Sequence, residues 1–301
     1  MSLIDRAVSN GVRVAAWTFD ELYGRDSKFL DGLDDREQAY VAEIPSDTHV
    51  WTTKPNVIRK APAKTGQGRP KKTPRVARQR PACEVRNLVK YSSKFQQQSW
   101  QRYRIKDTEN GPEVWEVKWR RAWRKTEDKL PSRQQTLIVA RNVRTGEMKY
   151  FLSNRVVGRG GTTLRWLLRV AFSRWVIEAC FRVTKEELGM DHFEVRGWRC
   201  IHRHYYVTAL SYLLCSRIRH RLDKDQTGAL SVEQVRRSLN AYLAHHHLPP
   251  LLRDEAFEKE LANQDYYQAR NAQAKKSHTK TRVKFYHQRG IDVDKIKSCI
   301  P

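Results

Sequence analysis

The sequence predicts an α/β fold in which a short strand–helix–strand unit is followed by an antiparallel β segment and then by helices. Three observations predict this order. Strand-like apolar runs flank a helical stretch within residues 12–44, β-like alternation recurs between residues 113 and 152, and helical spacing begins near residue 162. At 301 residues, with 39% hydrophobic residues, the chain can form one large domain or two ordinary ones.

The opening segment, residues 1–48, predicts a parallel pair of strands. Residues 12–19 form an apolar run of strand type that ends at Asp20. Residues 25–36 have the spacing of a helix, and residues 40–44 form a second short strand. Strand, helix and strand at this spacing favour a parallel pair within an α/β core.

Residues 49–90 are expected to form a flexible basic segment. Lys, Arg, Pro, Gly and Gln dominate residues 54–81, and apolar residues are scarce. Residues 54–90 contain twelve Lys and Arg against one acidic residue. Residues 91–158 then predict an antiparallel β insertion, because β-like stretches are separated by turn residues. These stretches are 113–119, 136–140 and 148–152, with turns at Gly111 and at Thr145-Gly146.

The C-terminal part of the chain predicts helices. Within segment 159–222, the strongest helical signal runs from Thr162 to about Leu188, and Gly189 is placed to end it. A second helix is expected near residues 205–222.

The last segment, residues 223–301, is expected to hold one helix and a basic tail. The helix lies near residues 231–244, and residues 273–301 are expected to be loosely ordered.

The charge and cysteine content restrict the class of protein. A net charge of +25 and a pI near 10.1 predict a polyanionic partner, with duplex DNA the commonest and a membrane surface the rival. Five cysteines without a CxxC pair argue against a disulfide framework and a zinc ribbon, and they suit a reducing cytoplasm. The sequence shows no signal peptide, and no apolar run reaches the eighteen residues of a membrane span.

Two carboxylates are candidates for chemistry. Asp20 follows a strand, where α/β sheets place ligand groups, although it could also cap the next helix. Glu178 lies in the long helix with Arg174 and Lys185 within roughly 40° of it on the same face. The alternative for these three residues is a pair of surface ion bridges.

These residues carry a specific resemblance. Arg174-x3-Glu178-x6-Lys185 resembles the signature of the bacterial insertion-sequence DDE transposases of the Tyr-Arg-Glu-Lys branch. Trp17-Thr-Phe-Asp20-Glu-Leu-Tyr-Gly24 is similar to the second-Asp motif of that family, which also carries a β insertion. The resemblance covers most of residues 1–245.

The resemblance implies an RNase H-like fold in which three carboxylates hold two Mg²⁺ ions for cleavage and strand transfer at transposon ends. Asp20 would be the second Asp and Glu178 the Glu, and both would be metal ligands. Arg174 and Lys185 would hold DNA phosphates. The implied partner is double-stranded DNA at the bacterial nucleoid in the cytoplasm, with a homodimer as a candidate assembly and no membrane association.

The sequence departs from the family pattern at two places. Only nineteen residues precede Asp20, so the first three strands and the first carboxylate are expected to be missing from an N-terminally truncated, partial core. Ala171 stands where the signature has Tyr. Two functions therefore stay open: an insertion-sequence transposase in an inactive or partial copy, or a non-catalytic DNA-binding remnant or repressor of the intact element.

Two further features could contact DNA. Gly68-Arg69-Pro70-Lys71-Lys72 resembles an AT-hook core, in which Arg69, Lys71 and Lys72 would reach a narrow minor groove; the alternative is a solvated basic linker. Four tryptophans among basic residues could stack on unpaired bases, or at least two of them could pack in the β insertion. They are Trp100, Trp115, Trp119 and Trp123.

Overall fold

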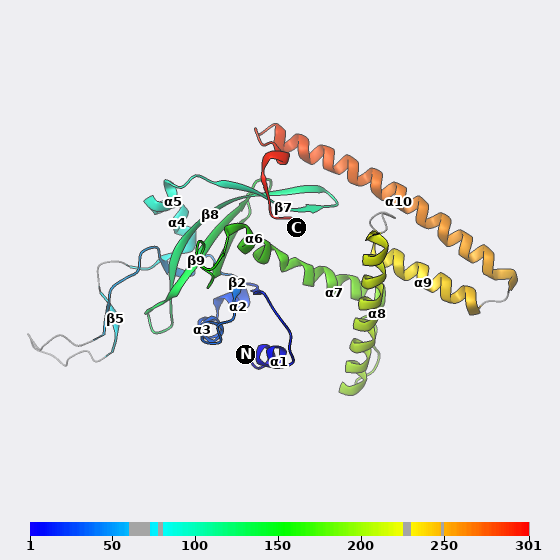
Figure 1. The fold of residues 1–301 in the computed structure, drawn as a ribbon, viewed down its shortest axis with the longest axis horizontal. Coiled ribbons are helices and arrows are strands. Elements are labelled where there is room, and N and C mark those ends of the chain that lie inside the picture. Colours follow the sequence, from blue (N-terminus) through cyan, green and yellow to red (C-terminus); the bar gives the residue numbers. More distant parts are fainter. Residues whose placement is uncertain (60–72, 78–80, 225–229, 248–249, 301) are drawn as a thin grey trace, which may run out of the picture. The chain divides into compact units, whose positions relative to one another are not determined.

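The chain divides into two compact units, each described by itself. The computed structural model describes residues 1–59, 73–77, 81–224, 230–247 and 250–300. Unit 1 combines Met1–Arg174 with Arg282–Pro301, and unit 2 comprises Trp175–Thr281 (Figure 1). In the described residues, unit 1 contains the strands together with short helices, and unit 2 is helical.

Unit 1 contains the following elements in chain order. They are α1 (Ser2–Ser9), β1 (Trp17–Phe19), α2 (Glu21–Arg25), α3 (Ser27–Asp35), β2 (Tyr40–Glu43), β3 (His49–Trp51), β4 (Val57–Ile58), β5 (Arg75–Val76), β6 (Cys83–Glu84), α4 (Val85–Tyr91), α5 (Ser93–Gln96), β7 (Gln101–Thr108), β8 (Gly111–Lys125), β9 (Pro131–Asn142), β10 (Met148–Ser153), α6 (Leu164–Ser173), a 3₁₀ turn (Val293–Lys295) and β11 (Lys297–Ser298). Unit 2 contains α7 (Trp175–Leu188), α8 (Trp198–Lys224), α9 (Val232–His247) and most of α10 (Pro250–His287).

One mixed sheet forms the framework of unit 1. Its strand order is β1-β2-β10-β9-β8-β3-β6, with β7 paired to β8 and β11 paired to β7. The expected parallel pair is confirmed, because β1 and β2 run parallel with Phe19 aligned to Ala42. The expected antiparallel β segment is also confirmed, but it does not form a separate layer. It continues the same sheet, since β10 pairs antiparallel with β2.

The first strand is shorter than the sequence predicted. Residues 12–16 lie outside β1, and Val12 and Val14 are exposed. The reason is the position of the partner strand: β2 begins at Tyr40, which is aligned with Trp17, so the residues before Trp17 have no strand to pair with there.

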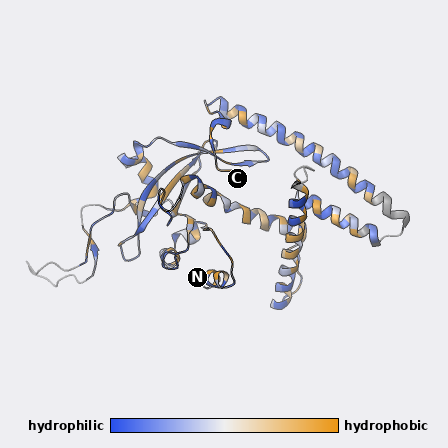
Figure 2. Ribbon diagram, in the orientation of Figure 1, coloured by the Kyte–Doolittle hydropathy of each residue, from blue (hydrophilic) through white to orange (hydrophobic). Residues whose placement is uncertain are grey.

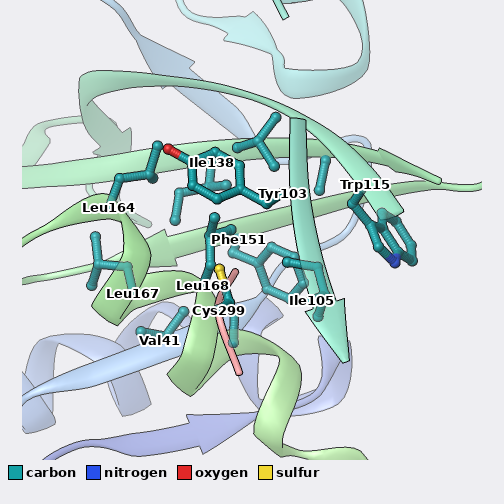
Figure 3. Packing of buried hydrophobic residues seen from close by; sticks show 13 residues of the cluster. Val41, Tyr103, Ile105, Trp115, Ile138, Phe151, Leu164, Leu167, Leu168 and Cys299 are labelled. Atoms are coloured by element: carbon teal, nitrogen blue, oxygen red, sulfur yellow. The ribbon is translucent and has the colours of Figure 1, made fainter. Parts of the chain in front are cut away.

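Helices cover both faces of the sheet. Because side chains alternate between faces along a strand, neighbours such as Ile138 and Val139 belong to different clusters. On one face, Leu164, Leu167 and Leu168 of α6 pack against the strands, and this cluster is drawn in Figure 3. On the other face, α4 and α5 supply buried apolar residues; they are Val85, Leu88 and Phe95.

The basic segment 49–90 is ordered at both ends, in contrast to the expectation. His49–Trp51 forms β3, which pairs with β8 and β6. Residues 83–91 form β6 and α4, and Val85 and Leu88 are buried. Few apolar side chains were enough at these ends, because Val50, Val85 and Leu88 are buried in one core cluster of the sheet. Within residues 73–77, only the short β5 is formed, and it pairs with β4.

The C-terminal tail is also ordered, which corrects the expectation for residues 273–301. Helix α10 continues to His287, and β11 pairs in parallel with β7. Tyr286 and Cys299 are 1% and 2% exposed. The tail is basic overall, but Tyr286, Ile291, Val293 and Cys299 are buried in unit 1, and this burial outweighs the hydrophilic composition.

The expected helix from residue 162 to 188 is interrupted at one residue. Arg174 has helical dihedral angles (φ −55°, ψ −37°) but separates α6 from α7 and is the last residue of this part of unit 1. The predicted end is confirmed, because α7 ends at Leu188 and Gly189 takes a positive φ of 64°.

Unit 2 has a small core. Cys215, Val232 and Val235 are its buried apolar cluster, and Arg236 pairs with Glu187 at 3.1 Å between α9 and α7. Helix α10 is largely hydrophilic along its length (Figure 2). None of the helices in the described part of the chain is both long enough and apolar enough to cross a membrane.

Candidate functional site

Asp20 lies at the carboxyl end of the parallel strand pair. It follows β1 directly, and its Oδ1 accepts hydrogen bonds from the backbone N–H groups of Leu22 (3.1 Å) and Tyr23 (3.4 Å). Asp20 is therefore the N-cap of α2, the alternative that its sequence position left open. Both hydrogen bonds end on Oδ1, so they leave the lone pairs of Oδ2 for a further ligand, such as a cation.

Glu43 lies beside Asp20 in the sheet, and the sequence analysis did not single it out. It is the last residue of β2, and the alignment of Phe19 with Ala42 brings Asp20 and Glu43 to the same edge. Alternation along β2 places the Glu43 side chain on the face that Val41 and α6 share. The sequence offered a signal: this acidic residue is the last but one of the second predicted strand, residues 40–44, which follows the strand that ends at Asp20.

The Glu43 carboxylate is paired with two cations. Lys149 of β10 donates a hydrogen bond to Oε1 at 2.8 Å, and the Arg174 Nε lies 3.9 Å from Oε2. The Glu43 side chain is 13% exposed and those of Lys149 and Arg174 are about a quarter exposed, at 25% and 26%. Partial burial reduces screening by water and strengthens such a network relative to a surface pair.

Gly24 allows α2 to approach the end of β2. A Cβ atom built on Gly24 would lie 1.8 Å from the backbone oxygen of Glu43, which is far inside van der Waals contact. Only glycine fits this approach, so Gly24 fixes the short helix that Asp20 caps against the strand that Glu43 ends.

Arg174 is positioned by the packing of α6. Leu167, Leu168 and Ala171 are buried against the sheet, and Arg174 follows at the C-terminal end of this helix. The sequence resemblance implies that Arg174 holds a DNA phosphate. The structure adds a second contact, with Glu43, which holds the guanidinium at the edge where Asp20 lies.

Glu178 and Lys185 belong to unit 2, whereas Asp20 belongs to unit 1. Glu178 lies in the first turn of α7 and Lys185 in its last turn, and both are exposed. A carboxylate near a helix N-terminus and a cation near its C-terminus both suit the helix dipole. Among the described residues, no group of three or more His, Cys, Asp and Glu side chains is arranged to hold a metal ion.

The other candidate residues have different outcomes. Arg69, Lys71 and Lys72 lie outside the described residues. The core role is confirmed for Trp115, which is 2% exposed, and Trp119 packs half-buried against the same cluster.

The remaining two tryptophans differ from each other. The ring of Trp100 is covered by Arg141 at 4.6 Å and by Lys118 at 5.0 Å, so its faces are already occupied by cations. Trp123 is half-buried and lines a pocket beside β8.

Comparison with known proteins finds a family match for the N-terminal part of the chain. A mixed α/β sheet with carboxylates at the end of a parallel strand pair, in a strongly basic chain, is compatible with a nuclease fold. Residues 1–112 match the family described as DDE superfamily endonuclease. The matched residues include Asp20 and Glu43 and stop before Arg174, Glu178 and Lys185. No curated protein matches the chain.

This match supports a likeness to DDE transposases, and the endonucleases of that superfamily act on DNA. Nucleases of this superfamily generally use divalent metals. The family match is consistent with the sequence resemblance at Asp20. It covers 112 of the 301 residues.

Proposed function

We propose that this protein is a DNA transposase of the insertion-sequence type, with an RNase H-like core. One observation carries the proposal: the residues that match the DDE endonuclease family contain Asp20 at the carboxyl end of a parallel strand, where α/β sheets place ligand groups. The net charge of +25 supports DNA as the partner.

The proposed roles follow from the chemistry of each side chain. Asp20 in unit 1 and Glu178 in unit 2 are each assigned to metal binding, as the sequence resemblance implies. The bound Mg²⁺ would supply Lewis-acid stabilisation of the reacting phosphate. Asp20 would use Oδ2, because Oδ1 caps α2. Arg174 and Lys185 bind phosphate oxygens, and Glu43 orients Arg174 at 3.9 Å.

A second candidate function is a DNA-binding protein without catalysis, either a remnant or a repressor of an intact element. The observation that favours it is the helix cap: Asp20 Oδ1 accepts hydrogen bonds from the backbone N–H groups of Leu22 and Tyr23. Asp20 would then serve only as a helix cap.

A cleavage assay separates the two functions. The purified chain is incubated with transposon-end duplexes and Mg²⁺ or Mn²⁺, beside Asp20→Asn and Glu178→Gln. Metal-dependent cleavage that both substitutions abolish supports the transposase. Glu186→Gln, at another exposed acid of α7, is the matched control and keeps full cleavage. Binding without cleavage by any form supports the non-catalytic protein.

The proposed DNA binding by residues 54–81 is tested by measuring how the affinity for duplex DNA changes with salt concentration. The ten Lys and Arg of residues 54–81 are expected to release counterions, so deletion of this segment flattens the salt dependence of affinity by roughly 0.9 per lost phosphate contact. An unchanged slope would reduce the segment to a linker. Failure of the intact chain to bind duplex DNA at any salt concentration would contradict both proposed functions.

A further inference from the structure

The end of helix α7 is closed by a tight turn. Gly189 takes a positive φ of 64°, and the Met190 N–H donates a hydrogen bond to the Thr184 backbone oxygen at 3.0 Å. The His192 N–H donates to the Gly189 oxygen, also at 3.0 Å. Thr184 is 4% exposed, so the turn is anchored on a buried residue. The last turn of α7, which carries Lys185, therefore has a well-defined backbone.

His204 of α8 contacts this turn directly. Its Nε2 lies 2.7 Å from the Gly189 backbone oxygen, which thus receives a donor from α8 as well as one from the turn itself. Because a carbonyl oxygen can only accept, the His204 Nε2 carries the proton. The carbonyl groups at the end of a helix have no partner within the helix, and donors beside them are stabilising. This hydrogen bond ties α8 to the end of α7.

The His204 ring is itself held in place. Phe193, in the connection between α7 and α8, packs edge-on against this ring with the ring centroids 5.8 Å apart. The Thr208 hydroxyl donates to the His204 backbone oxygen at 2.8 Å, and Thr208 is 4% exposed. His204 is half-buried between these neighbours. A side chain that is fixed by packing and by its hydrogen bonds can hold another group at a constant position.

A second contact acts on a different face of the same turn. Arg236 of α9 pairs with Glu187 at 3.1 Å, and these side chains are 29% and 21% exposed. Glu187 and Lys185 are two residues apart and therefore about 200° apart around the helix axis. The ion pair holds the face of α7 that is directed toward α9, and Lys185 points away from it. Lys185 is exposed, and no acidic side chain in the described part of the chain forms an ion pair with it.

We propose that His204 is a positioning residue for Lys185. This inference rests on the proposed function, in which Lys185 binds a DNA phosphate. The Lys185 ammonium stands on a flexible four-carbon stem, so the points that it can reach depend on the backbone that carries it. His204 fixes this backbone through Gly189, and Arg236 fixes it from α9. His204 thereby sets the place at which one cation meets the phosphates of the duplex.

The test measures the affinity of the full chain for duplex DNA over a range of salt concentrations. Loss of one phosphate contact lowers the salt slope by roughly 0.9, which is the effect expected for Lys185→Ala. His204→Phe keeps a ring against Phe193 but removes the donor to Gly189, and it is expected to lower the slope by roughly 0.5–0.9. His204→Gln keeps a donor of similar reach and is expected to keep the slope of the unmodified chain.

A double variant separates positioning from a general loss of structure. If His204 acts through Lys185, adding His204→Phe to Lys185→Ala lowers the slope no further. His202→Phe is the matched control. His202 lies two residues away on α8, is half-buried and packs on Trp198 of its own helix with the rings 4.1 Å apart. This control is expected to keep the slope.

Three results would overturn the proposal while duplex binding by the intact chain, and with it the proposed function, stands. They are an unchanged slope in His204→Phe, equal losses in His204→Phe and His204→Gln, and a further loss in the double variant. Should His204→Phe fail to fold, His204→Asn takes its place, because its shorter side chain cannot reach Gly189 and the same loss is expected. Absence of duplex binding by the intact chain would contradict the proposed function and, with it, the role of Lys185.

Discussion

Replacing Tyr286 with alanine is the strongest test of how the C-terminal residues complete unit 1. Tyr286 is 1% exposed, packs with Val114, Ile291 and Val293, and accepts a hydrogen bond from the Val114 N–H at 3.2 Å. Removing a buried aromatic ring costs about 3–5 kcal/mol, and the unpaired N–H adds to this cost. We therefore expect Tyr286→Ala to lower the free energy of unfolding of unit 1 by at least about 4 kcal/mol.

The ring and the hydroxyl can be separated. Tyr286→Phe keeps the ring and removes only the acceptor of the Val114 N–H, so its expected cost is about 1–2 kcal/mol. Tyr267→Ala is the matched control, because Tyr267 lies on the same helix α10 but is 41% exposed, and it is expected to cost less than about 1 kcal/mol.

Urea unfolding measures the change in the free energy of unfolding, and hydrogen exchange shows which strands lose protection. Amides of β7 and β8 should lose protection in Tyr286→Ala, since β11 and the Tyr286 cluster hold this end of the sheet. If Tyr286→Ala and Tyr267→Ala lowered stability equally, or if β7 and β8 stayed fully protected, the docking of residues 282–301 would be refuted.

Three further predictions concern buried groups of unit 1. Burial raises the pKa of the Cys299 thiol to about 11 from an ordinary 9.0. The free energy of unfolding is therefore unaffected below pH 9 and falls by about 2–3 kcal/mol as the pH rises to 11. Unfolding measured across this pH range should not show this fall in Cys299→Ala. Asp31→Asn leaves the buried Arg124 guanidinium, now 2.6 Å from the carboxylate, without its anion; because Asp31 is 43% exposed, we expect calorimetry to show a loss of about 2 kcal/mol. Gly24→Ala forces a Cβ against the Glu43 backbone oxygen, and urea unfolding should show a loss of about 3 kcal/mol.

Each of these has an outcome that contradicts it. For the pH prediction, it is an alkaline unfolding profile that does not change when Cys299 is replaced. For the ion pair, Asp35→Asn is the control, because Asp35 and Arg133 are 72% and 67% exposed and their pair is worth less than roughly 1 kcal/mol. Equal stability losses in Asp31→Asn and Asp35→Asn would show that the burial of Arg124 does not strengthen its ion pair. For the glycine, Gly197→Ala meets nothing closer than 3.8 Å, and a loss as large as at Gly24 would show that the close approach is irrelevant.

Local patterns made much of the framework predictable. The β-like stretches within residues 113–152 predicted strands that are now β8, β9 and β10, whose successive side chains point to the two covered faces of the sheet. Gly189 predicted the end of α7, since a positive φ of 64° is accessible to glycine without strain. The pairing of Trp17–Phe19 with Tyr40–Ala42 followed from the strand–helix–strand order.

Contacts between distant segments were not predictable in this way. The role of Glu43 depends on Lys149 and Arg174, which are more than a hundred residues away in the sequence. The pocket beside β8 depends on two strands, β3 and β7, which pair with the same edge of β8 and leave residues 118–122 between them without a strand on that edge in the described part of the chain. No local periodicity encodes either arrangement.

The interruption of unit 1 by unit 2 has a consequence for synthesis on the ribosome. Chains emerge at about 5–20 residues per second, and domains generally fold as they appear. The sheet around β7 and β8 cannot be completed when residue 174 emerges, because Tyr286, β11 and Cys299 are made after all of unit 2. A chain interrupted before residue 282 would therefore leave the sheet of unit 1 without β11 and the Tyr286 cluster.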